Sequence, residues 1–259
     1  MKRVTRRVLS LIGIGLLGGF LSGTFGIGGG ILMVPLFVLI LGIDQRHASA
    51  LSLTAVLPAA IVGSITYGVQ GDVDVIAAAL IAIGGIGGAL IGTRLLRTVP
   101  LGWLRWGFVV LLLLVAVRMV IEVPEGTEHI EFGAPSILGL IALGLIVGIA
   151  SGLFGIGGGV VIVPALIGLF GVGELIAKGT SLAAMIPTSI TGTIANTRAR
   201  LVRPVDGLIV GAAAAAASFP GALVAHVLPT RVSHILFAVL VLIAAVQLAI
   251  KAWRARKDR

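Results

Sequence analysis

The residues best suited to chemistry in this sequence are glycines and serines in two short matching segments. Residues 22–35 read SGTFGIGGGILMVP and residues 151–164 read SGLFGIGGGVVIVP, so ten of the fourteen positions are identical. A glycine run that leads into a helix leaves the first amides of that helix unpaired at the positive end of its dipole. Such a turn binds an anion without a buried lysine. The sequence therefore predicts two anion-binding turns, to which the hydroxyls of Ser22 and Ser151 would add donors.

Glycines at this spacing have a second interpretation, because small residues four positions apart also let two membrane helices pack closely. Gly26 and Gly30 fit that spacing, so packing and anion binding both stay open for the two segments. A nucleotide-phosphate loop is excluded, because no Lys-Ser or Lys-Thr pair follows the glycines. Gly84, Gly88 and Gly92 also recur every four residues, and this stripe predicts helix packing.

A second shared pattern follows each glycine segment. Ser52 is followed by Pro58 in the first half, and Ser181 is followed by Pro187 in the second. A proline inside a helix removes one backbone hydrogen bond and frees a carbonyl, often beside a kink. These four residues are therefore candidates for the substrate path.

Polar residues follow the second of these prolines at helical spacing. Ser189, Thr193 and Asn196 are separated by four and three residues, which places them on one face of a helix. This face would either line a solute path or form hydrogen bonds between helices. Lys178 is expected to be a loop residue before this helix, and His226 a hydrogen-bonded structural group.

The elements that must position these residues lie in a membrane. The chain has 259 residues, of which 58% are apolar and only 11% are charged, and its mean hydropathy is +1.18. Soluble domains carry about 25% charged residues. A soluble fold of this composition would lack the polar surface to cover its core. We therefore expect an all-α integral membrane protein embedded in a lipid bilayer.

The charges argue against several other classes of protein. The net charge of +9 comes largely from basic clusters at the two ends of the chain, as expected for topology signals rather than for nucleic-acid binding. There is no cysteine, and the four histidines are scattered, so we expect no metal site and no cofactor. No carboxylate lies in the interior of a predicted span, so neither catalytic residues nor a proton relay is expected.

The two glycine segments belong to an internal duplication with an offset of 129 residues. We expect a first transmembrane repeat over residues 1–121, an acidic extracytoplasmic connector over 122–135 and a second repeat with a basic cytoplasmic tail over 136–259. Downstream of a short insertion, Val73 would correspond to Val205 and Gly88 to Gly221.

Apolar segments near 8–24, 28–42, 47–68, 73–95 and 101–121 recur at 136–150, 157–170, 175–197, 206–228 and 232–250. Glycine costs about 1 kcal/mol inside a helix, so each repeat should open with a glycine-broken helical hairpin, followed by three spanning helices. Both pieces of each hairpin are predicted to be shorter than a full span of about 30 Å. Counting the hairpin as down-and-back places most arginine loops and both termini on the cytoplasmic side. The odd number of elements then makes the two repeats inverted.

The duplicated Ser-Gly-x-Phe-Gly-Ile-Gly-Gly-Gly-x-x-x-Val-Pro motif resembles that of the TauE/SafE family, the sulfite exporter group of membrane transporters. The likeness covers the length of the chain, its two halves and the downstream Ser/Pro pairs. It implies transport of a sulfur-containing anion such as sulfite or an organosulfonate across a bacterial-type inner membrane. By this resemblance, the motif residues that would form the translocation site are Ser22, Gly23, Phe25, Gly26, Gly28, Gly29, Gly30, Pro35, Ser151, Gly152, Phe154, Gly155, Gly157, Gly158, Gly159 and Pro164.

The function that this pattern favours is a permease whose inverted repeats rock around an anion site near the membrane midplane. A channel-like anion pore is the main alternative, because the sequence does not separate passive from coupled transport. A membrane scaffold or assembly factor would not need paired glycine turns. An intramembrane enzyme would need acid, base or arginine groups beside the glycines, and the sequence has none there. Direction, coupling ion and oligomeric state stay open.

Overall fold

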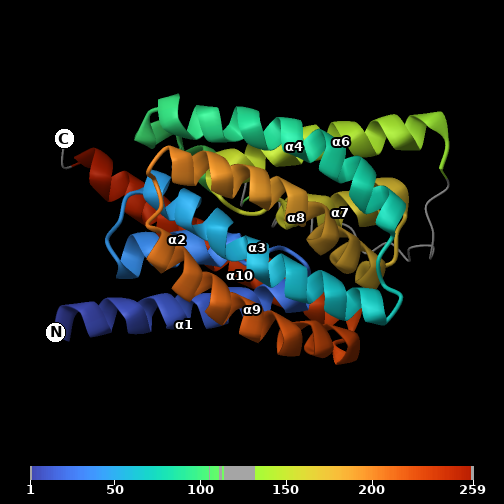
Figure 1. Ribbon diagram of the computed structural model, residues 1–259, viewed down its shortest axis with the longest axis horizontal. Helices are drawn as coiled ribbons and strands as arrows, with labels where there is room; N and C mark the ends of the chain where they lie inside the picture. The colour runs from blue at the N-terminus through green and yellow to red at the C-terminus, as the bar shows by residue number, and fades with distance from the viewer. Residues whose placement is uncertain (1, 105, 111–112, 114–131, 258–259) are drawn as a thin grey trace.

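The structure, a computed structural model, describes residues 2–104, 106–110, 113 and 132–257 (Figure 1). This part of the chain is helical and contains no β-strand, as the sequence predicts. The helices with defined bounds are α1 (Lys2–Phe25), α2 (Gly30–Ile40), α3 (Gln45–Val69), α4 (Val75–Thr98), α6 (Ala134–Phe154), α7 (Gly159–Phe170), α8 (Glu174–Arg198), α9 (Pro204–Val227) and α10 (Thr230–Lys257).

The predicted breaks at the glycines are confirmed. α1 ends at Phe25 and α2 begins at Gly30, while α6 ends at Phe154 and α7 begins at Gly159. The predicted length of the first piece is wrong, because α1 has 24 residues and α6 has 21, enough to rise about 36 and 32 Å. Only α2 and α7, with 11 and 12 residues, are too short to span.

Helix boundaries repeat with a constant offset of 129 residues. α3 and α8 begin at Gln45 and Glu174, and α4 and α9 begin at Val75 and Pro204. The predicted insertion in the second repeat, which would align Val73 with Val205, is therefore wrong. Gly92, not Gly88, corresponds to Gly221. A Cβ on Gly92 would lie 2.3 Å from Ile149 O, and a Cβ on Gly221 would lie 2.1 Å from Phe20 O. The two contacted carbonyls are themselves 129 residues apart, so the two glycines make equivalent contacts.

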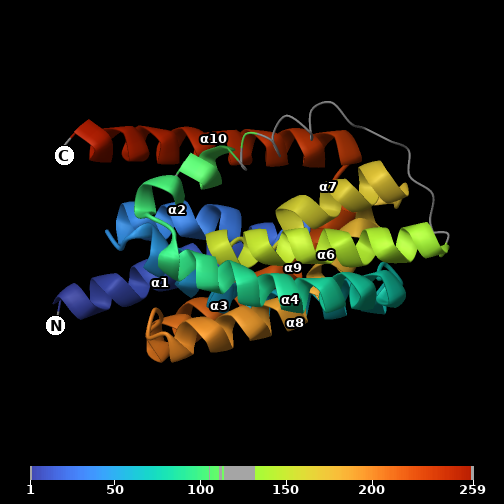
Figure 2. The same cartoon turned by 90° about the horizontal axis from the view of Figure 1, so that it is seen from above.

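Two long helix pairs form the body of the molecule. α1 lies along α9, and α4 lies along α6 (Figures 1 and 2), so the first helix of each half packs on the fourth helix of the other. Glycines make these approaches possible: a Cβ on Gly19 would lie 2.0 Å from Ala214 O, and one on Gly84 would lie 2.0 Å from Ile141 O. The packing role predicted for the glycine stripe of residues 84–92 is confirmed.

Five of the described helices are long and apolar enough to cross a membrane, namely α1 from Thr5 onward, α3, α4, α6 and α9. Large apolar side chains such as Leu17, Ile83 and Ile146 are exposed on their outer faces. Exposed apolar area on this scale requires lipid or another apolar partner. The protein is therefore a multi-pass membrane protein.

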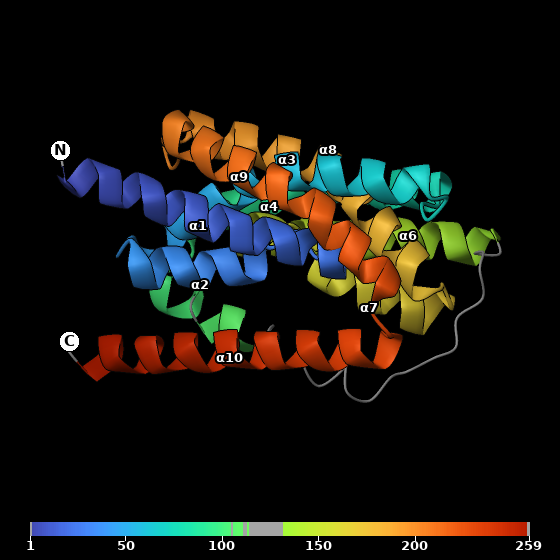
Figure 3. The same ribbon diagram turned by 90° about the horizontal axis from the view of Figure 1, so that it is seen from below.

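The two ends of the described chain lie at the same end of the molecule, as Figures 1 and 3 show. The C-terminal ends of α4 and α8, which carry Arg97 and Arg198, lie at this end as well. α1 and α6 run in opposite directions along the long axis (Figures 1 and 2). The predicted acidic connector lies outside the described residues except at 132–135, and α6 already begins at Ala134. The proposed repeat boundaries and the inversion across a bilayer stay predictions.

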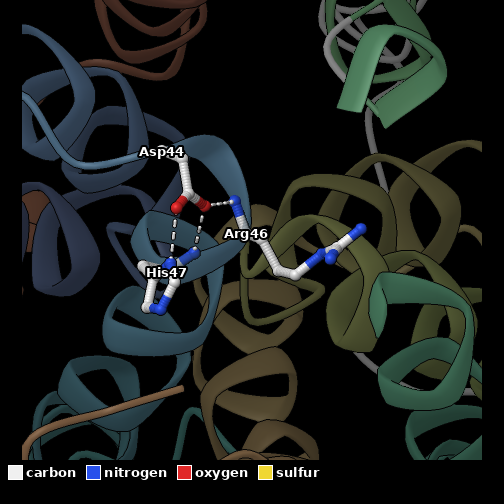
Figure 4. A network of polar contacts seen from close by, with 3 residues as sticks. All are labelled: Asp44, Arg46 and His47. Carbon is white, nitrogen blue, oxygen red and sulfur yellow. Dashed lines mark hydrogen bonds and ion pairs between the residues drawn. The ribbon is translucent and has the colours of Figure 1, made fainter. Parts of the chain in front are cut away.

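The turn into α3 is set by an aspartate cap. The Asp44 carboxylate accepts the backbone N–H of Arg46 at 2.9 Å and that of His47 at 3.0 Å (Figure 4). Its other oxygen lies 2.6 Å from Nδ1 of His47. Arg46 extends away and donates to the carbonyl of Val99, which ties this turn to the end of α4. These contacts satisfy amides that a helix start leaves unpaired.

Candidate functional site

The two glycine turns have nearly the same backbone conformation. In the first turn Gly26, Gly28 and Gly29 have φ of 69°, 77° and 67°. In the second turn the corresponding glycines at 155, 157 and 158 have φ of 72°, 78° and 101°. Residues with a Cβ rarely adopt these angles, so glycine is required at these positions whatever surrounds them.

The turns touch each other through reciprocal contacts. A Cβ on Gly30, the first residue of α2, would lie 2.4 Å from Gly155 O. A Cβ on Gly159, the first residue of α7, would lie 2.4 Å from Gly26 O. The N-termini of both short helices therefore lie beside each other inside the protein, as the sequence predicts for two turns that meet.

Two apolar side chains occupy the place where the turns meet. Val56 of α3 and Met185 of α8 are corresponding positions, and each is fully buried. A Cβ on Gly28 would lie 3.1 Å from both Val56 Cγ1 and Met185 Cε, and a Cβ on Gly157 would contact the same two side chains. The Gly159 amide donates to Met185 Sδ at 3.1 Å, a weak acceptor.

Close packing is itself a reason for several of these glycines. A Cβ on Gly29 would lie 2.0 Å from Gly18 O, and one on Gly23 would lie 2.1 Å from Ser218 O. The packing interpretation is thus confirmed at these positions. It does not exclude anion binding, because packing uses the missing Cβ whereas an anion would use the backbone amides.

The serines predicted to support the turns differ in their hydrogen bonds. Ser181 Oγ donates to Gly26 O at 3.0 Å. Ser22, Ser52 and Ser151 are buried, and their hydroxyls have no partner among the described residues. Ser22 O and Ser151 O each accept an amide from the following turn, so both serines lie directly behind a glycine turn.

The predicted polar face of α8 lies against other helices. Ser189 and Asn196 are fully buried, and the side-chain polar atoms of Ser189, Thr193 and Asn196 have no partner within the described part of the chain. Gly192, between them, lies against Leu53 of α3. Interhelical hydrogen bonds, one of the two interpretations of this face, are therefore not formed with the residues described.

The remaining predicted residues frame the turns. Phe25 and Pro35 are buried, and Phe154 stacks near Phe108 with ring centroids 5.5 Å apart. Gly152 packs against the backbone of α4, where a Cβ would lie 2.7 Å from Ala89 O. The helices that contain a proline within their span include α2 (Pro35), α3 (Pro58), α7 (Pro164) and α8 (Pro187).

The prediction that Lys178 is a loop residue is wrong. It lies inside α8 and is only 2% exposed. Its Nζ lies 2.6 Å from Glu174 Oε1 and donates to Ser233 Oγ at 3.1 Å. The Gly26 turn packs on Lys178, since a Cβ there would lie 2.6 Å from Lys178 Cα. The four-residue spacing of Glu174 and Lys178 is typical of an ion pair on one face of a helix.

The structural role predicted for His226 is confirmed. Its Nε2 lies 2.8 Å from Asp72 Oδ2 and its Nδ1 lies 2.8 Å from Ala222 O. Tyr67 stacks beside it and donates to Gly23 O at 2.8 Å. Within the described residues, no group of three or more His, Asp or Glu side chains could hold a metal ion.

Comparison with known proteins points to transport. The family model of the sulfite exporter TauE/SafE matches residues 1–119 and 140–259. A "Probable membrane transporter protein" of Xylella fastidiosa (strain 9a5c) is 32% identical over 195 residues, which cover 74% of each chain. "Probable membrane transporter protein YunE" of Bacillus subtilis (strain 168) is 33% identical over 120 residues, 44% of each chain. The comparison with solved structures finds no significant match.

Proposed function

Because the chain belongs to the sulfite exporter TauE/SafE family of membrane transporters, we propose that it carries a small oxyanion of sulfur, such as sulfite or an organosulfonate. The anion binds where the two glycine turns meet. The observation that carries this proposal is the reciprocal contact of Gly30 with the second turn and Gly159 with the first.

The geometry supports an anion rather than a cation. The first amides of α2 and α7 have no carbonyl acceptor in their own helix, and that of Gly159 donates only to the weak acceptor Met185 Sδ. Both helix dipoles direct their positive ends to the same place. Amide donors bind negative charge without the cost of a buried lysine. The known sulfur oxyanions all present acceptor oxygens to such donors.

The arrangement of the halves supports alternating access. α1 and α6 run in opposite directions, and the helices of one half pack on those of the other (Figure 1). Val56 and Met185 form a thin apolar layer at the turns. Small rotations of one half against the other would move this layer and open the turns to one membrane face at a time. Placing the arginine-bearing end and both termini in the cytoplasm of an inner membrane follows the positive-inside rule.

The test places a carboxylate at the turns. In Val56→Asp, a fixed negative charge would lie beside the amides and compete with the substrate, while Val56→Asn has the same shape without the charge. We would measure uptake of sulfite, thiosulfate and sulfoacetate into proteoliposomes, with acetate as a carboxylate control.

Saturable uptake of a sulfur anion is expected for the wild type. Val56→Asp should lower this uptake at least about tenfold more than Val56→Asn, because each 1.4 kcal/mol of lost binding is one factor of ten. Equal uptake by the two variants would overturn the anion site at the turns. Glycine variants are poorer tests, because Gly29→Val would collide with the Gly18 carbonyl and damage the fold.

A further inference from the structure

The two copies of the turn region differ in a systematic way. The α8 series Glu174, Lys178 and Ser181 corresponds to Gln45, Ser49 and Ser52 of α3 at the offset of 129 residues. Tyr67 of α3 corresponds in the same way to Asn196 of α8. Around the Gly26 turn these positions carry a charged pair and a large ring. Around the Gly155 turn all four positions are uncharged, and Ser49 and Asn196 are shorter than their counterparts Lys178 and Tyr67.

Apart from the Ser22 hydroxyl, the copy around the Gly26 turn is internally satisfied. Lys178 pairs with Glu174 and Ser233, and Ser181 donates to the carbonyl of Gly26. Tyr67 donates to the carbonyl of Gly23. The protein's own side chains therefore occupy this copy.

The copy around the Gly155 turn is not satisfied. The carboxamides of Gln45 and Asn196 are fully buried, and neither their nitrogen nor their oxygen has a hydrogen-bond partner among the described residues. The hydroxyls of Ser49, Ser52 and Ser151 are also buried and have no hydrogen-bond partner within the described part of the chain. A buried polar group without a partner costs about 1–3 kcal/mol, so five together require an explanation. We call these five residues the unpaired polar cluster.

Backbone contacts bring the members of the unpaired polar cluster together. A Cβ on Gly155 would lie 2.1 Å from Ser49 O, and Gly155 N donates to Ser151 O at 2.8 Å. Contacts of Gly63 with Leu182 and of Gly192 with Leu53 show that α3 and α8 pack in opposite directions.

That register places the other members beside the same turn. Because Gly192 lies against Leu53 and the helices are antiparallel, Asn196, four residues after Gly192, lies opposite Ser49, four residues before Leu53. Gln45 and Ser52 lie one turn to either side of Ser49 on the same face of α3.

We infer that the unpaired polar cluster is the substrate-binding subsite, and that it takes a small oxyanion through uncharged donors. This inference rests on the proposed function and assigns the substrate to one of the two repeat copies only. In the other copy, the Lys178–Glu174 pair fills the corresponding place. Two carboxamides and three hydroxyls all donate hydrogen bonds, and none of them carries a negative charge that would repel an anion. Uncharged donors also hold an anion weakly enough for release, which transport requires.

The inference also assigns an entry side. The N-terminus of α3 and the C-terminus of α8 lie at the end of the molecule where both chain termini lie (Figures 1 and 2). The substrate therefore reaches the unpaired polar cluster from the end that we propose to be cytoplasmic.

The test uses the full-length protein with Gln45→Leu and Asn196→Leu, and measures both melting temperature and sulfite affinity in detergent. Without ligand, each variant should melt at or above the wild-type temperature, because an unpaired buried amide is replaced by an apolar group of similar size. Sulfite affinity should fall about tenfold or more in each, since a hydrogen bond to a charged group is lost. Ser218→Ala is the control: its Oγ donates to Ala59 O at 2.9 Å, so it should lower the melting temperature and leave affinity unchanged.

The outcomes separate the two proposals. Lower melting temperatures with unchanged affinity in the leucine variants would make the cluster structural and overturn the inference. Lost affinity in those variants, together with equal uptake by Val56→Asp and Val56→Asn, would support the cluster and overturn only the site at the turns. A wild type that binds neither sulfite, thiosulfate nor sulfoacetate would overturn both.

Discussion

At the scale of single residues, Lys178 and Glu174 form an ion pair inside a helix bundle. Their side chains are 3% and 12% exposed, so water screens them little. Bringing two charges out of water is costly, and the pair is tolerated because each charge has the other nearby and Lys178 also donates to Ser233. Such a pair contributes little net stability while it is intact. Removing only one partner, in contrast, strongly destabilises the protein.

We predict that Lys178→Met destabilises the protein by about 3–5 kcal/mol, because it removes the ammonium group that lies 2.6 Å from the buried Glu174 carboxylate. The double variant Lys178→Met/Glu174→Leu should recover most of this loss, since both charges of the pair are then removed together. Thermal unfolding in detergent checks both. A double variant at least as unstable as the sum of the single variants would contradict the prediction.

The Asp44 cap lies before α3 and responds to acid. Burial alone would raise the pKa of Asp44, but hydrogen bonds from the backbone and ring of His47 and from the Arg46 amide outweigh it, so its pKa lies below the ordinary 3.8. A depressed folded pKa stabilises the protein above the unfolded pKa, and the stabilisation is lost as pH falls through the folded value.

The wild type should therefore exceed Asp44→Ala in stability by about 1 kcal/mol near neutral pH, as helix caps usually do. The difference should persist down to about pH 4 and shrink below it. Melting temperatures of both proteins between pH 3 and pH 7 measure this. A gap that stays constant across that range would show that the charge of Asp44 plays no part.

At the scale of helices, glycines decide which faces can meet. In α1, a Cβ on Gly19 would lie 2.0 Å from the carbonyl of Ala214 in α9, whereas a Cβ on Gly13 meets nothing within 4 Å. The two glycines lie in the same helix and differ mainly in what they face, so they form a matched pair of sites.

Gly19→Ala is expected to destabilise the protein by about 1–3 kcal/mol, because the helices must separate to admit the methyl group. Gly13→Ala should be neutral or stabilise it by up to about 1 kcal/mol, since alanine favours the helix. Unfolding of the two variants side by side gives the comparison. Equal effects would mean that the α1–α9 contact is looser than the structure shows.

At the scale of the whole molecule, the fold assigns its loops to two ends. The loops after α4 and α8 lie with the chain termini, and the loop after α3 lies at the other end (Figures 1 and 2). The chain has no cysteine, so a single introduced cysteine reports its own position without interference.

We expect Thr98→Cys and Thr197→Cys to react with a membrane-impermeant thiol reagent from the same face of the membrane, and Gln70→Cys from the opposite face. All three native side chains are exposed in the structure, so access to the reagent is not limited by burial. Labelling of intact cells against inverted vesicles measures the face. Reaction of Gln70→Cys from the same face as the other two would contradict the proposed topology.

The amino-acid sequence alone determined the helical class, the membrane location, the duplication and the breaks at residues 26–29 and 155–158. These features depend on local chemistry: apolar composition favours lipid, and positive φ favours glycine. The same local signals predicted an insertion before Val205 that the constant offset of the helices excludes, and they made α1 too short. Helix ends depend on caps and packing, which a count of apolar residues does not contain.

Only the tertiary structure decided which side chains share an environment. Lys178 is buried beside Ser233 of α10, and Gln45 and Asn196 come together because α3 and α8 pack in opposite directions. Val56 and Met185 are ordinary apolar residues in the sequence, yet they occupy the place where the turns meet. Burial and pairing are properties of residues distant along the chain, so no local pattern determines them.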